Sequence, residues 1–491
     1  MALRRHMEWT PAVDVSCTLL AQLGIACAAI VASSAGAWAD EWQIKPSVSA
    51  YESFTSNANL APPGDEQADF ATVVSPGLDV HRDGPRLIFD LGYKLDGIVY
   101  ARNSEMDEVR HQLRFDSRGT VIPEMLFLDA DAAIAQEPKS SQQPTSGSAL
   151  TASTNQTSVY AYRVSPFLNN HLGTFADSEL RYTFSQVYGN DLPDSTFNSI
   201  DGSLVSGSQF PRFVWALNAS GATSSGSRDV TNIFAAASGE YPINRFFGVL
   251  GSAGYERISD NTLDDEPNGP IGSAGVRLTP GPRTDVQVQF NHRFDSNFVT
   301  GKGSYLIDPQ SRITASYSEK IVNSQVTFVD NISFLERDAS GNFIDSRTER
   351  LFHLGQTNFG VEDNAFRLRS ADLSLHFVRD RYILDGVAYY ERRDIDATGE
   401  TDTAFGANLN WGYQLNETAT VYLAGRYRRE TFDTGTGTDH QQLVGAGLSL
   451  VQNLNETLDA VAAVNFTKQL SNNQDDEFNE TVVSLGLLKR F

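Results

Sequence analysis

The chain ends in the stretch Thr481-Val482-Val483-Ser484-Leu485-Gly486-Leu487-Leu488-Lys489-Arg490-Phe491. Alternate positions in it are apolar, which is the period of a β-strand with one apolar face. A long strand that stops on a phenylalanine is typical of the strand that closes a bacterial outer-membrane barrel, because closure leaves no open edge in lipid. A buried C-terminal strand of a soluble sheet is the alternative interpretation.

The same stretch resembles the terminal signal that the barrel-assembly machinery reads. That signal combines a polar residue, a glycine two positions later and a final aromatic residue, which are Ser484, Gly486 and Phe491 here. Lys489 departs from the signal, because an apolar residue is usual at that position. The resemblance implies that the barrel-assembly machinery is a partner of this chain.

The N-terminus has the pattern of a cleaved secretory signal over residues 1–39. Arg4 and Arg5 supply the positive region, residues 19–32 form the apolar core, and Ala37-Trp38-Ala39 is a small-x-small cleavage site. Residues 40–491 are then the mature chain, and we expect them to form one domain, an outer-membrane β-barrel. We also expect the protein to lie in the bacterial outer membrane.

Composition excludes several classes of protein. Both cysteines, Cys17 and Cys27, lie in the predicted signal, so we expect no disulfide and no cysteine metal site in the mature chain. No later segment reaches 18 apolar residues, although 40% of residues are hydrophobic. The formal net charge of −23 makes nucleic acid an unsuitable partner. No cofactor and no metal ion are expected.

Alternating segments of strand length follow one another from residue 43 to the end. In residues 285–293 the acidic, amide and basic side chains share one face, while Val286, Val288 and Phe290 share the other. A soluble sandwich also alternates. Charges in the middle of one face and large apolar groups along the other nevertheless favour a wet lumen inside and lipid outside.

The connections between these segments favour an all-β antiparallel transmembrane barrel. Short connections with Pro, Asn, Gly or Asp alternate with longer ones rich in Asp, Ser, Thr and Gly, as periplasmic turns and extracellular loops do. We count about 22 strands, or 18–20 if residues 199–206 and 298–307 are loops. The predicted short turns are 82–85, 241–244, 279–282, 308–311, 379–381, 415–417 and 454–456, and the predicted loops are 55–69, 136–156, 188–197, 221–229, 259–268, 323–365, 395–401, 432–438 and 469–477.

Several stretches resemble the beta-barrel porin 2 family of bacterial outer-membrane proteins, which includes proteins similar to EpsL. The stretches that carry the resemblance are Tyr51-Glu52-Ser53-Phe54-Thr55-Ser56-Asn57-Ala58-Asn59-Leu60, Val74-Ser75-Pro76-Gly77-Leu78, Ser206-Gly207-Ser208-Gln209-Phe210, Gly254-Tyr255-Glu256 and Ala315-Ser316-Tyr317-Ser318. The resemblance covers most of the mature chain and carries no catalytic residue. It implies an outer-membrane barrel associated with exopolysaccharide export, with polysaccharide and components of an export system as partners.

The alternation also assigns ionisable side chains to the inward face. The candidate lumen-lining residues are Asp90, Lys94, Asp96, Arg110, Arg114, Asp129, Asp131, Arg181, Arg293, Arg312, Asp372, Asp385, Arg426 and Arg428. Acids and bases nearly balance in this assignment, so we expect the excess negative charge in the extracellular loops. Facing charges could create a transverse field in a wide channel where inward Tyr51 and Tyr389 stack on sugars. Alternatively, the pairs solvate and brace the lumen.

Two further expectations concern the loops. The acidic loops, which include Asp264 and Asp475, are candidates for contact with divalent cations or with lipopolysaccharide phosphates through bridging cations. The alternative interpretation of these loops is a solvated surface that resists aggregation. Loop 323–365 contains the apolar pieces 326–329 and 332–335, which predict a hairpin or an inward fold that narrows the pore. We see no N-terminal segment of about 150 residues to act as a plug, which argues against a TonB-type transporter.

We predict a porin-like channel for polysaccharide or small polar solutes, with lipid and lipopolysaccharide around it and no catalytic residue. An outer-membrane lipase or protease is one alternative, because such enzymes need a His near a Ser or an Asp on the barrel wall. His376 shares the inward face with Ser374 and Asp372, but three residues in a row on one strand do not make a relay. A surface-exposed structural or adhesive barrel is the other alternative.

Overall fold

The computed structural model describes residues 42–140, 143–144, 155–190, 192–226, 229–260, 267–294, 296–322, 335–337, 343–345, 350–351, 366–395, 399–433 and 437–491. Residues Gln43–Phe491 form one compact unit. The predicted signal, residues 1–39, lies outside the described residues.

The described chain is built almost wholly of β-strands. Twenty-two of them form a single sheet. Their bounds are β1 Gln43–Thr55, β2 Asp69–Asp83, β3 Leu87–Tyr100, β4 Glu108–Ile122, β5 Leu126–Pro138, β6 Gln156–Leu172, β7 Ala176–Gly189, β8 Leu192–Ser206, β9 Val214–Ser225, β10 Val230–Pro242, β11 Phe247–Asp260, β12 Asn268–Gly281, β13 Thr284–Arg293, β14 Ser296–Asp308, β15 Ser311–Val322, β19 Phe366–Arg379, β20 Tyr382–Ile395, β21 Glu400–Asn416, β22 Ala419–Asp433, β23 Thr438–Asn455, β24 Leu458–Ser471 and β25 Phe478–Arg490. Two short 3-10 helices, η1 Ser104–Met106 and η2 Gln474–Asp476, lie in connections.

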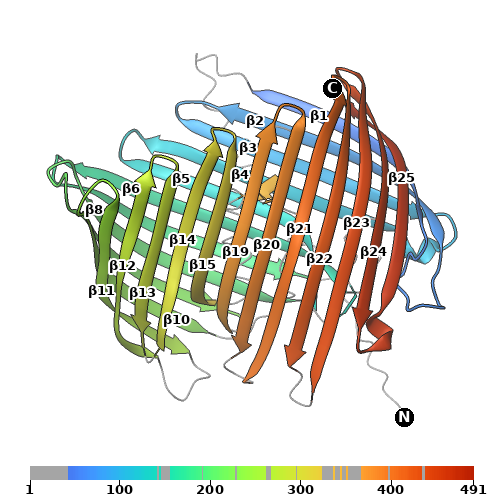
Figure 1. Ribbon diagram of the computed structural model, residues 1–491. Helices are drawn as coiled ribbons and strands as arrows, with labels where there is room; N and C mark the ends of the chain where they lie inside the picture. The colour runs from blue at the N-terminus through green and yellow to red at the C-terminus, as the bar shows by residue number, and fades with distance from the viewer. Residues whose placement is uncertain are drawn as a thin grey trace, which may run out of the picture. The chain divides into compact units, whose positions relative to one another are not determined.

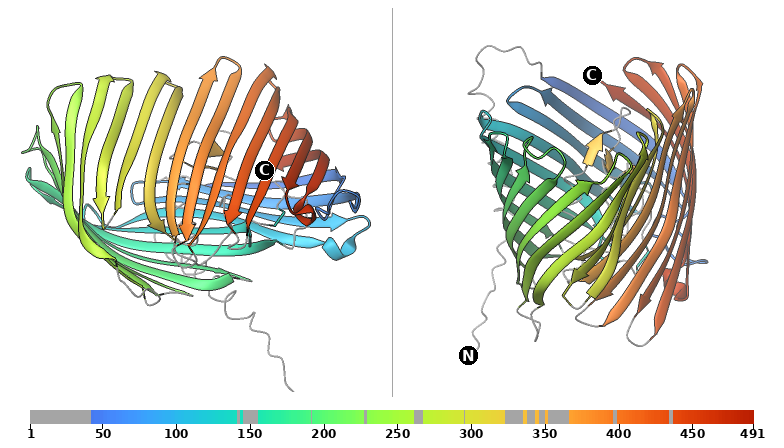
Figure 2. Two further views of the ribbon diagram at one scale, coloured as in Figure 1. Left: turned by 60° about the horizontal axis from the view of Figure 1, so that its bottom comes forward. Right: turned by 60° about the vertical axis from the view of Figure 1, so that its left-hand side comes forward.

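The sheet closes on itself, because β1 pairs antiparallel with β2 on one side and with β25 on the other (Figure 1). The prediction of a closed antiparallel barrel of about 22 strands is confirmed. The two weak segments, 199–206 and 298–307, are parts of β8 and β14. In the turned views the blue and cyan N-terminal strands face the orange C-terminal strands across the barrel (Figure 2).

Short turns and longer connections alternate along most of the barrel, as the sequence predicts. The exceptions are the short connection 190–191 before the longer 207–213, and the short connection 294–295. The two-residue turn between β19 and β20 places Asp380 at a φ of 52°, a left-handed conformation that aspartate tolerates better than most residues. Two predicted loops are wrong in their bounds, because cross-strand pairing continues into them. In place of 188–197, β7 runs to Gly189 and β8 begins at Leu192, and in place of 221–229, β9 runs to Ser225 and β10 begins at Val230. No helix among the described residues is long and apolar enough to cross a membrane.

The two faces of the sheet differ in chemistry. Large apolar side chains of one face stand exposed, among them Val99 at 57%, Val109 at 61% and Leu485 at 62%. Exposing apolar surface to water costs about 25 cal/mol per Å². Such a continuous band is therefore stable only against lipid, and it defines the outward face. The opposite face carries the polar and charged side chains and lines the lumen.

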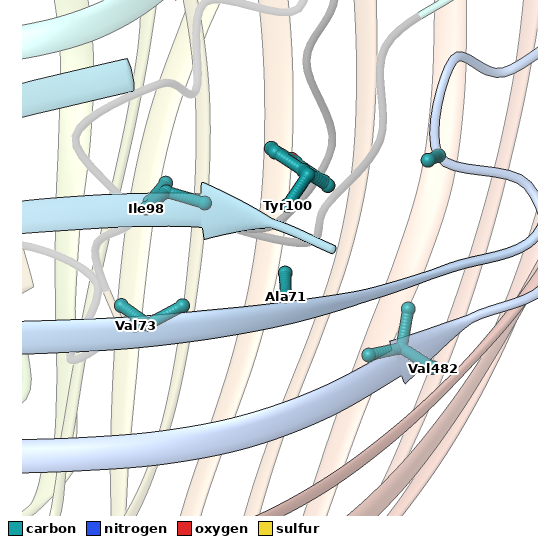
Figure 3. Close-up of a cluster of buried hydrophobic side chains, with 6 residues drawn as sticks. Ala71, Val73, Ile98, Tyr100 and Val482 are labelled. Carbon is teal, nitrogen blue, oxygen red and sulfur yellow. The ribbon is translucent and has the colours of Figure 1, made fainter. Parts of the chain in front are cut away.

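Near the seam between β25 and β1, the inward face carries a small apolar cluster. Ala71 and Val73 lie on β2, Ile98 and Tyr100 on β3 and Val482 on β25, and Ala58 from the connection between β1 and β2 completes the set (Figure 3). Asn57 fixes that connection, because its side-chain amide donates to the carbonyl oxygens of Ala61 and Asn479 at 2.8 and 3.1 Å. The residue range 56–68 therefore packs onto the barrel instead of projecting freely.

The segment 323–365 contains a second, three-stranded antiparallel sheet made of β16 Leu335–Arg337, β17 Phe343–Asp345 and β18 Arg350–Leu351. The predicted hairpin is therefore present, although its apolar pieces 326–329 and 332–334 lie outside the described residues. β18 approaches the wall strand β20 to within 8 Å between Cα atoms. Narrowing of the pore by this segment stays a prediction.

Candidate functional site: the charged lumen

The inward face of β3–β7 carries a chain of ion pairs. Asp129 lies at its centre and accepts hydrogen bonds from the guanidinium groups of Arg118, at 2.7 Å, and Arg181, at 2.9 Å. Arg181 also donates to Glu179 at 2.9 Å. Strand alternation brings these groups together, because residues two apart on one strand and opposite residues on the next share a face.

Asp96 and Asp131 form two further centres on the same wall. Asp96 is 2% exposed and accepts from Ser75 at 2.5 Å and Gln112 at 3.0 Å, with Lys94 2.8 Å away. Asp131 accepts from Arg163, whose Nη2 lies 2.8 Å from the carboxylate. These pairs satisfy carboxylates that the barrel has removed from bulk water.

The wall β10–β13 repeats the arrangement with different residues. Arg293 makes a two-pronged contact with Glu256, with both nitrogen–oxygen distances 2.6 Å. Arg277 bridges Glu240 at 3.1 Å and Asp285 at 2.7 Å. A planar guanidinium suits such a bridge because its donors form a fixed fork.

The wall β19–β25 contains the most buried pair of the described lumen. Arg393 and Asp402, on β20 and β21, are 3% and 4% exposed at their side chains, and Nη2 lies 2.6 Å from Oδ2. Arg428 lies 3.2 Å from Glu430, and Arg490 lies 2.6 Å from Asp459. Both pairs join a largely buried acid to a more exposed base.

The strand register places all fourteen candidate lumen residues on the face opposite the exposed apolar band. It brings Asp129 to Arg181, while Asp90 pairs with His81 at 2.9 Å and Asp385 with His376 at 2.6 Å. Arg293 pairs with Glu256, a residue that the sequence analysis had not placed in the lumen.

The expected balance of inward charge is wrong. The register adds to the inward face a group of carboxylates that period-two counting missed, because they lie close to strand ends; these are Glu137, Glu240, Glu256, Glu391, Asp402, Glu430 and Glu480. Fewer bases are added, namely Arg118, Arg277, Lys302, Arg393 and Arg490. Further inward acids are Asp79, Asp116, Glu179, Asp201, Asp285 and Asp459, and further inward bases are Lys45, Arg163 and Lys320. With these residues, inward acids exceed inward bases on the described strands, and part of the chain's negative charge lies in the lumen.

The two inward tyrosines pack against glycines on neighbouring strands. A Cβ built on Gly486 would lie 2.1 Å from Cδ1 of Tyr51, and one on Gly406 would lie 2.6 Å from the hydroxyl of Tyr389. Tyr389 is only 8% exposed. The expectation that Tyr389 offers a stacking surface to sugars is therefore wrong, because its ring already covers Gly406.

The enzyme alternative gains no relay from the geometry. The imidazole Nδ1 of His376 lies 2.6 Å from Asp385 on the next strand. The hydroxyl of Ser374 instead contacts the hydroxyl of Thr314, and Asp372 accepts from Ser316 at 3.4 Å. The structure does not join these three residues as nucleophile, base and orienting acid.

The terminal signal residues lie at the seam. Ser484 accepts a hydrogen bond from Ser53 at 2.9 Å, Gly486 accommodates the Tyr51 ring, and the backbone nitrogen of Phe491 donates to Pro46 at 2.9 Å. Lys489, the residue that departs from the signal, lies 5.7 Å from the Phe491 ring centre and donates to Thr457. Recognition of this signal during assembly stays a prediction.

Comparison with known proteins gives a fold and no family: no family model and no curated protein sequence matches the chain. Among solved structures, the siderophore receptor PirA from Acinetobacter baumannii is similar at a TM-score of 0.50 and 8% identity, over 91% of this chain and 80% of that one. The ferric preacinetobactin receptor BauA from the same organism is similar at a TM-score of 0.47 and 10% identity, over 92% of this chain and 80% of that one.

At such low identity the likeness to PirA shows the fold alone. The fold is an outer-membrane β-barrel. The exposed apolar band, the closed sheet and the polar lumen agree with it, and they place the protein in the bacterial outer membrane. The start of β1 and the end of β25 lie at the end of the barrel that carries the short turns, which is the periplasmic end in such barrels.

Proposed function

We propose that the protein is a porin-like channel that passes polar solutes through a charged lumen and prefers cations. The observation that carries the proposal is the inward face of a closed 22-stranded sheet, which is lined by ion pairs and by more acids than bases. Barrel diameter grows with strand number, so a barrel of this size has room for an aqueous path. Fixed negative charge along such a path raises the local concentration of cations.

Polysaccharide is the solute class that the resemblance to EpsL-like proteins implies, and export is the direction. A lumen of paired charges suits a long polar polymer, because its hydroxyl groups find donors and acceptors along the wall. Components of an export system are the expected partners at the periplasmic end.

Uptake of a bound ligand is the second candidate, because the solved structures similar to this fold include siderophore receptors. Barrels of 22 strands among outer-membrane transporters carry a plugged lumen. The two candidates differ in one measurement, since a channel conducts without a ligand and a plugged receptor does not.

Planar-bilayer recording tests the proposal. The purified barrel is expected to give discrete conductance steps, a reversal potential in a KCl gradient that reports cation preference, and a current that candidate oligosaccharides reduce. Absence of conductance at every voltage would sink the channel. Hydrolysis of a lipid or peptide substrate would instead support the enzyme alternative.

A pair of matched variants links the selectivity to the lumen. Asp90→Asn with Asp372→Asn removes inward carboxylates, and cation preference is expected to fall. Glu52→Gln removes an acid from the outward face, where Glu52 accepts from Thr72 at 2.8 Å, and is expected to leave the reversal potential unchanged. An equal shift from both variants would show that the lumen charge does not set the selectivity.

Deleting residues 323–365 tests the pore-narrowing segment separately. If the segment narrows the pore, its removal raises single-channel conductance. An unchanged conductance rules out the constriction while leaving the channel itself intact.

A further inference from the structure

Near the ends of the strands that are joined by the long connections, the outward face of β19–β24 carries a row of basic side chains. The row, here called the basic rim, consists of Arg367 and Arg369 on β19, Arg392 on β20, Arg429 on β22 and Lys468 on β24. Their positions alternate with inward residues such as Ser370 and Arg393, and they share a face with Leu373 and Phe405, which are 51% and 44% exposed.

The basic rim lies at one level of the membrane. On three of its strands the base stands two residues beyond an outward aromatic residue: Arg392 beyond Tyr390, Arg429 beyond Tyr427 and Lys468 beyond Phe466. Aromatic girdles mark the boundary between hydrocarbon and headgroups in outer-membrane barrels. One pleat beyond the girdle, at the extracellular end, an outward side chain reaches the headgroups of the outer leaflet.

The basic rim keeps a surplus of positive charge. Arg369 contacts Glu319 at 3.1 Å and Asp394 at 2.9 Å, and Arg392 contacts Asp394 at 2.8 Å. Within the described part of the chain, neither Arg429 nor Lys468 forms an ion pair with a carboxylate. The two acids Glu319 and Asp394 contact three of the five bases, Arg367, Arg369 and Arg392. Asp433 on β22 is a third outward acid near this end, so the described bases still outnumber the acids.

Arg369 and Arg392 also stand directly opposite each other across β19 and β20. Like charges in directly opposed positions destabilise a sheet. The carboxylate of Asp394, 2.9 Å from Arg369 and 2.8 Å from Arg392, offsets part of this penalty. Their side chains are 28% and 41% exposed, so an anion from the lipid side has access to both.

The opposite wall shows that this surplus is local. On β3–β9 every lysine and arginine of the strands faces inward, as Lys94, Arg114 and Arg181 do. A chain with a net charge of −23 thus gathers outward bases on one sector of its extracellular end. General solubility does not require such a placement, because this sector faces the membrane.

We propose that the basic rim binds the phosphate groups of lipopolysaccharide, the glycolipid of the outer leaflet. Guanidinium groups bind phosphate through paired charge-assisted hydrogen bonds, and Arg369 with Arg392 presents two such groups side by side. Arg429 and Lys468 extend the contact along the barrel, so one glycolipid with two phosphates is held across several strands. The acyl chains then lie on the apolar band below the girdle.

Lipid binding to the full-length barrel tests the proposal. The variant Arg392→Gln, Arg429→Gln, Lys468→Gln is compared with the control Arg257→Gln, which removes a single outward base near the same end of β11. Native mass spectrometry and titration with bisphosphorylated lipid A measure bound lipid. The triple variant is expected to bind about tenfold more weakly, because each neutralised base loses a charge-assisted hydrogen bond. The control is expected to bind like the native chain.

Two further lipids distinguish lipopolysaccharide phosphate from the other groups that the basic rim could bind. Dephosphorylated lipid A is expected to bind the native barrel as weakly as lipid A binds the triple variant. Vesicles of phosphatidylglycerol supply a lipid phosphate without the glycolipid, and they are expected to compete poorly. The proposal would be overturned if the triple variant bound lipid A as tightly as the native barrel does. It would also be overturned if the native barrel bound dephosphorylated lipid A or phosphatidylglycerol as tightly as it binds lipid A. An unchanged unfolding transition in lipid vesicles, followed by tryptophan fluorescence, shows that the triple variant folds, so this test stands apart from the channel proposal.

Discussion

The wall β3–β9 and the wall β19–β24 handle charge differently. Inside, both walls pair carboxylates with guanidinium groups, as Asp129 with Arg181 and Asp402 with Arg393 do. Outside, the first wall presents uncharged side chains at its extracellular level, whereas the second presents the basic rim. Inward charges are constrained by the need to satisfy buried groups, so they recur on both walls. Outward charges near lipid are not required by the fold, so they point to a contact.

The largest difference in stability between the walls is expected when one partner of an inward ion pair is removed. Asp402→Asn removes a carboxylate from Arg393, and both side chains are almost fully buried. Loss of one partner of a buried ion pair costs about 3–5 kcal/mol of the free energy of unfolding. Urea-induced unfolding of the barrel in lipid vesicles, followed by tryptophan fluorescence, measures this loss.

The control is Asp129→Asn on the other wall. Asp129 is 13% exposed, and its partners Arg118 and Arg181 are 58% and 24% exposed, so water reaches both guanidinium groups and a smaller cost of about 1–2 kcal/mol is expected. Adding Arg393→Met to Asp402→Asn is expected to recover most of the stability. Equal losses at Asp402 and Asp129 would contradict the difference in burial.

A smaller effect on the free energy of unfolding is expected at two tyrosine–glycine contacts, one at the seam and one on the wall β19–β24. Gly486→Ala and Gly406→Ala each place a methyl group against a tyrosine, at an expected cost of about 1–3 kcal/mol. At Gly486 the three nearest atoms all belong to Tyr51, whereas at Gly406 the backbone oxygen of Tyr427 lies 2.5 Å from the new atom. Side-chain removal can therefore relieve the first clash only.

The measurement is unfolding of the double variants relative to the tyrosine variants alone. Gly486→Ala is expected to cost little in a Tyr51→Ala background, while Gly406→Ala keeps its cost in a Tyr389→Ala background. Relief at both positions would show that the backbone contact at Gly406 is soft.

The fold was accessible from the sequence because two local rules are strong. Period-two alternation and turn residues such as Gly84 and Asp380 act over a few positions, and they gave the strands and their number. The error at 188–197 has a local cause as well. Asn190 lies in the turn, but the turn-former Pro193 lies inside β8, because cross-strand pairing of Val187 with Ser195 and of Gly189 with Leu192 continues past it.

Charge placement was less accessible, because a face assignment depends on where a strand ends. Glu430 and Glu480 lie near ends that the sequence leaves uncertain, so their inward direction was missed. Arg367 and Arg369 lie directly after the predicted loop 323–365, so the face that each side chain occupies was uncertain as well. A shift of one residue moves a side chain from lumen to lipid, so only the register separates the two walls.

The smallest effect is expected from copying the basic rim onto the wall that lacks it. Gln136 and Ser158 are outward, lie near the extracellular ends of β5 and β6, and stand directly opposite each other, as Arg369 and Arg392 do. Gln136→Arg with Ser158→Arg reproduces that opposed pair on the bare wall. Stability is expected to change by about 0.5 kcal/mol, because neither side chain is in the packed interior.

Bound lipid A is the informative measurement for this copied pair. The added arginines are expected to raise the amount of lipid A held by the barrel, up to the amount that the native basic rim holds. Gln136→Asn with Ser158→Thr is the uncharged control and is expected to add none. A folded, conducting variant that gains arginines and no lipid A would show that an opposed pair is insufficient. Capture would then depend on the extension of the rim through Arg429 and Lys468.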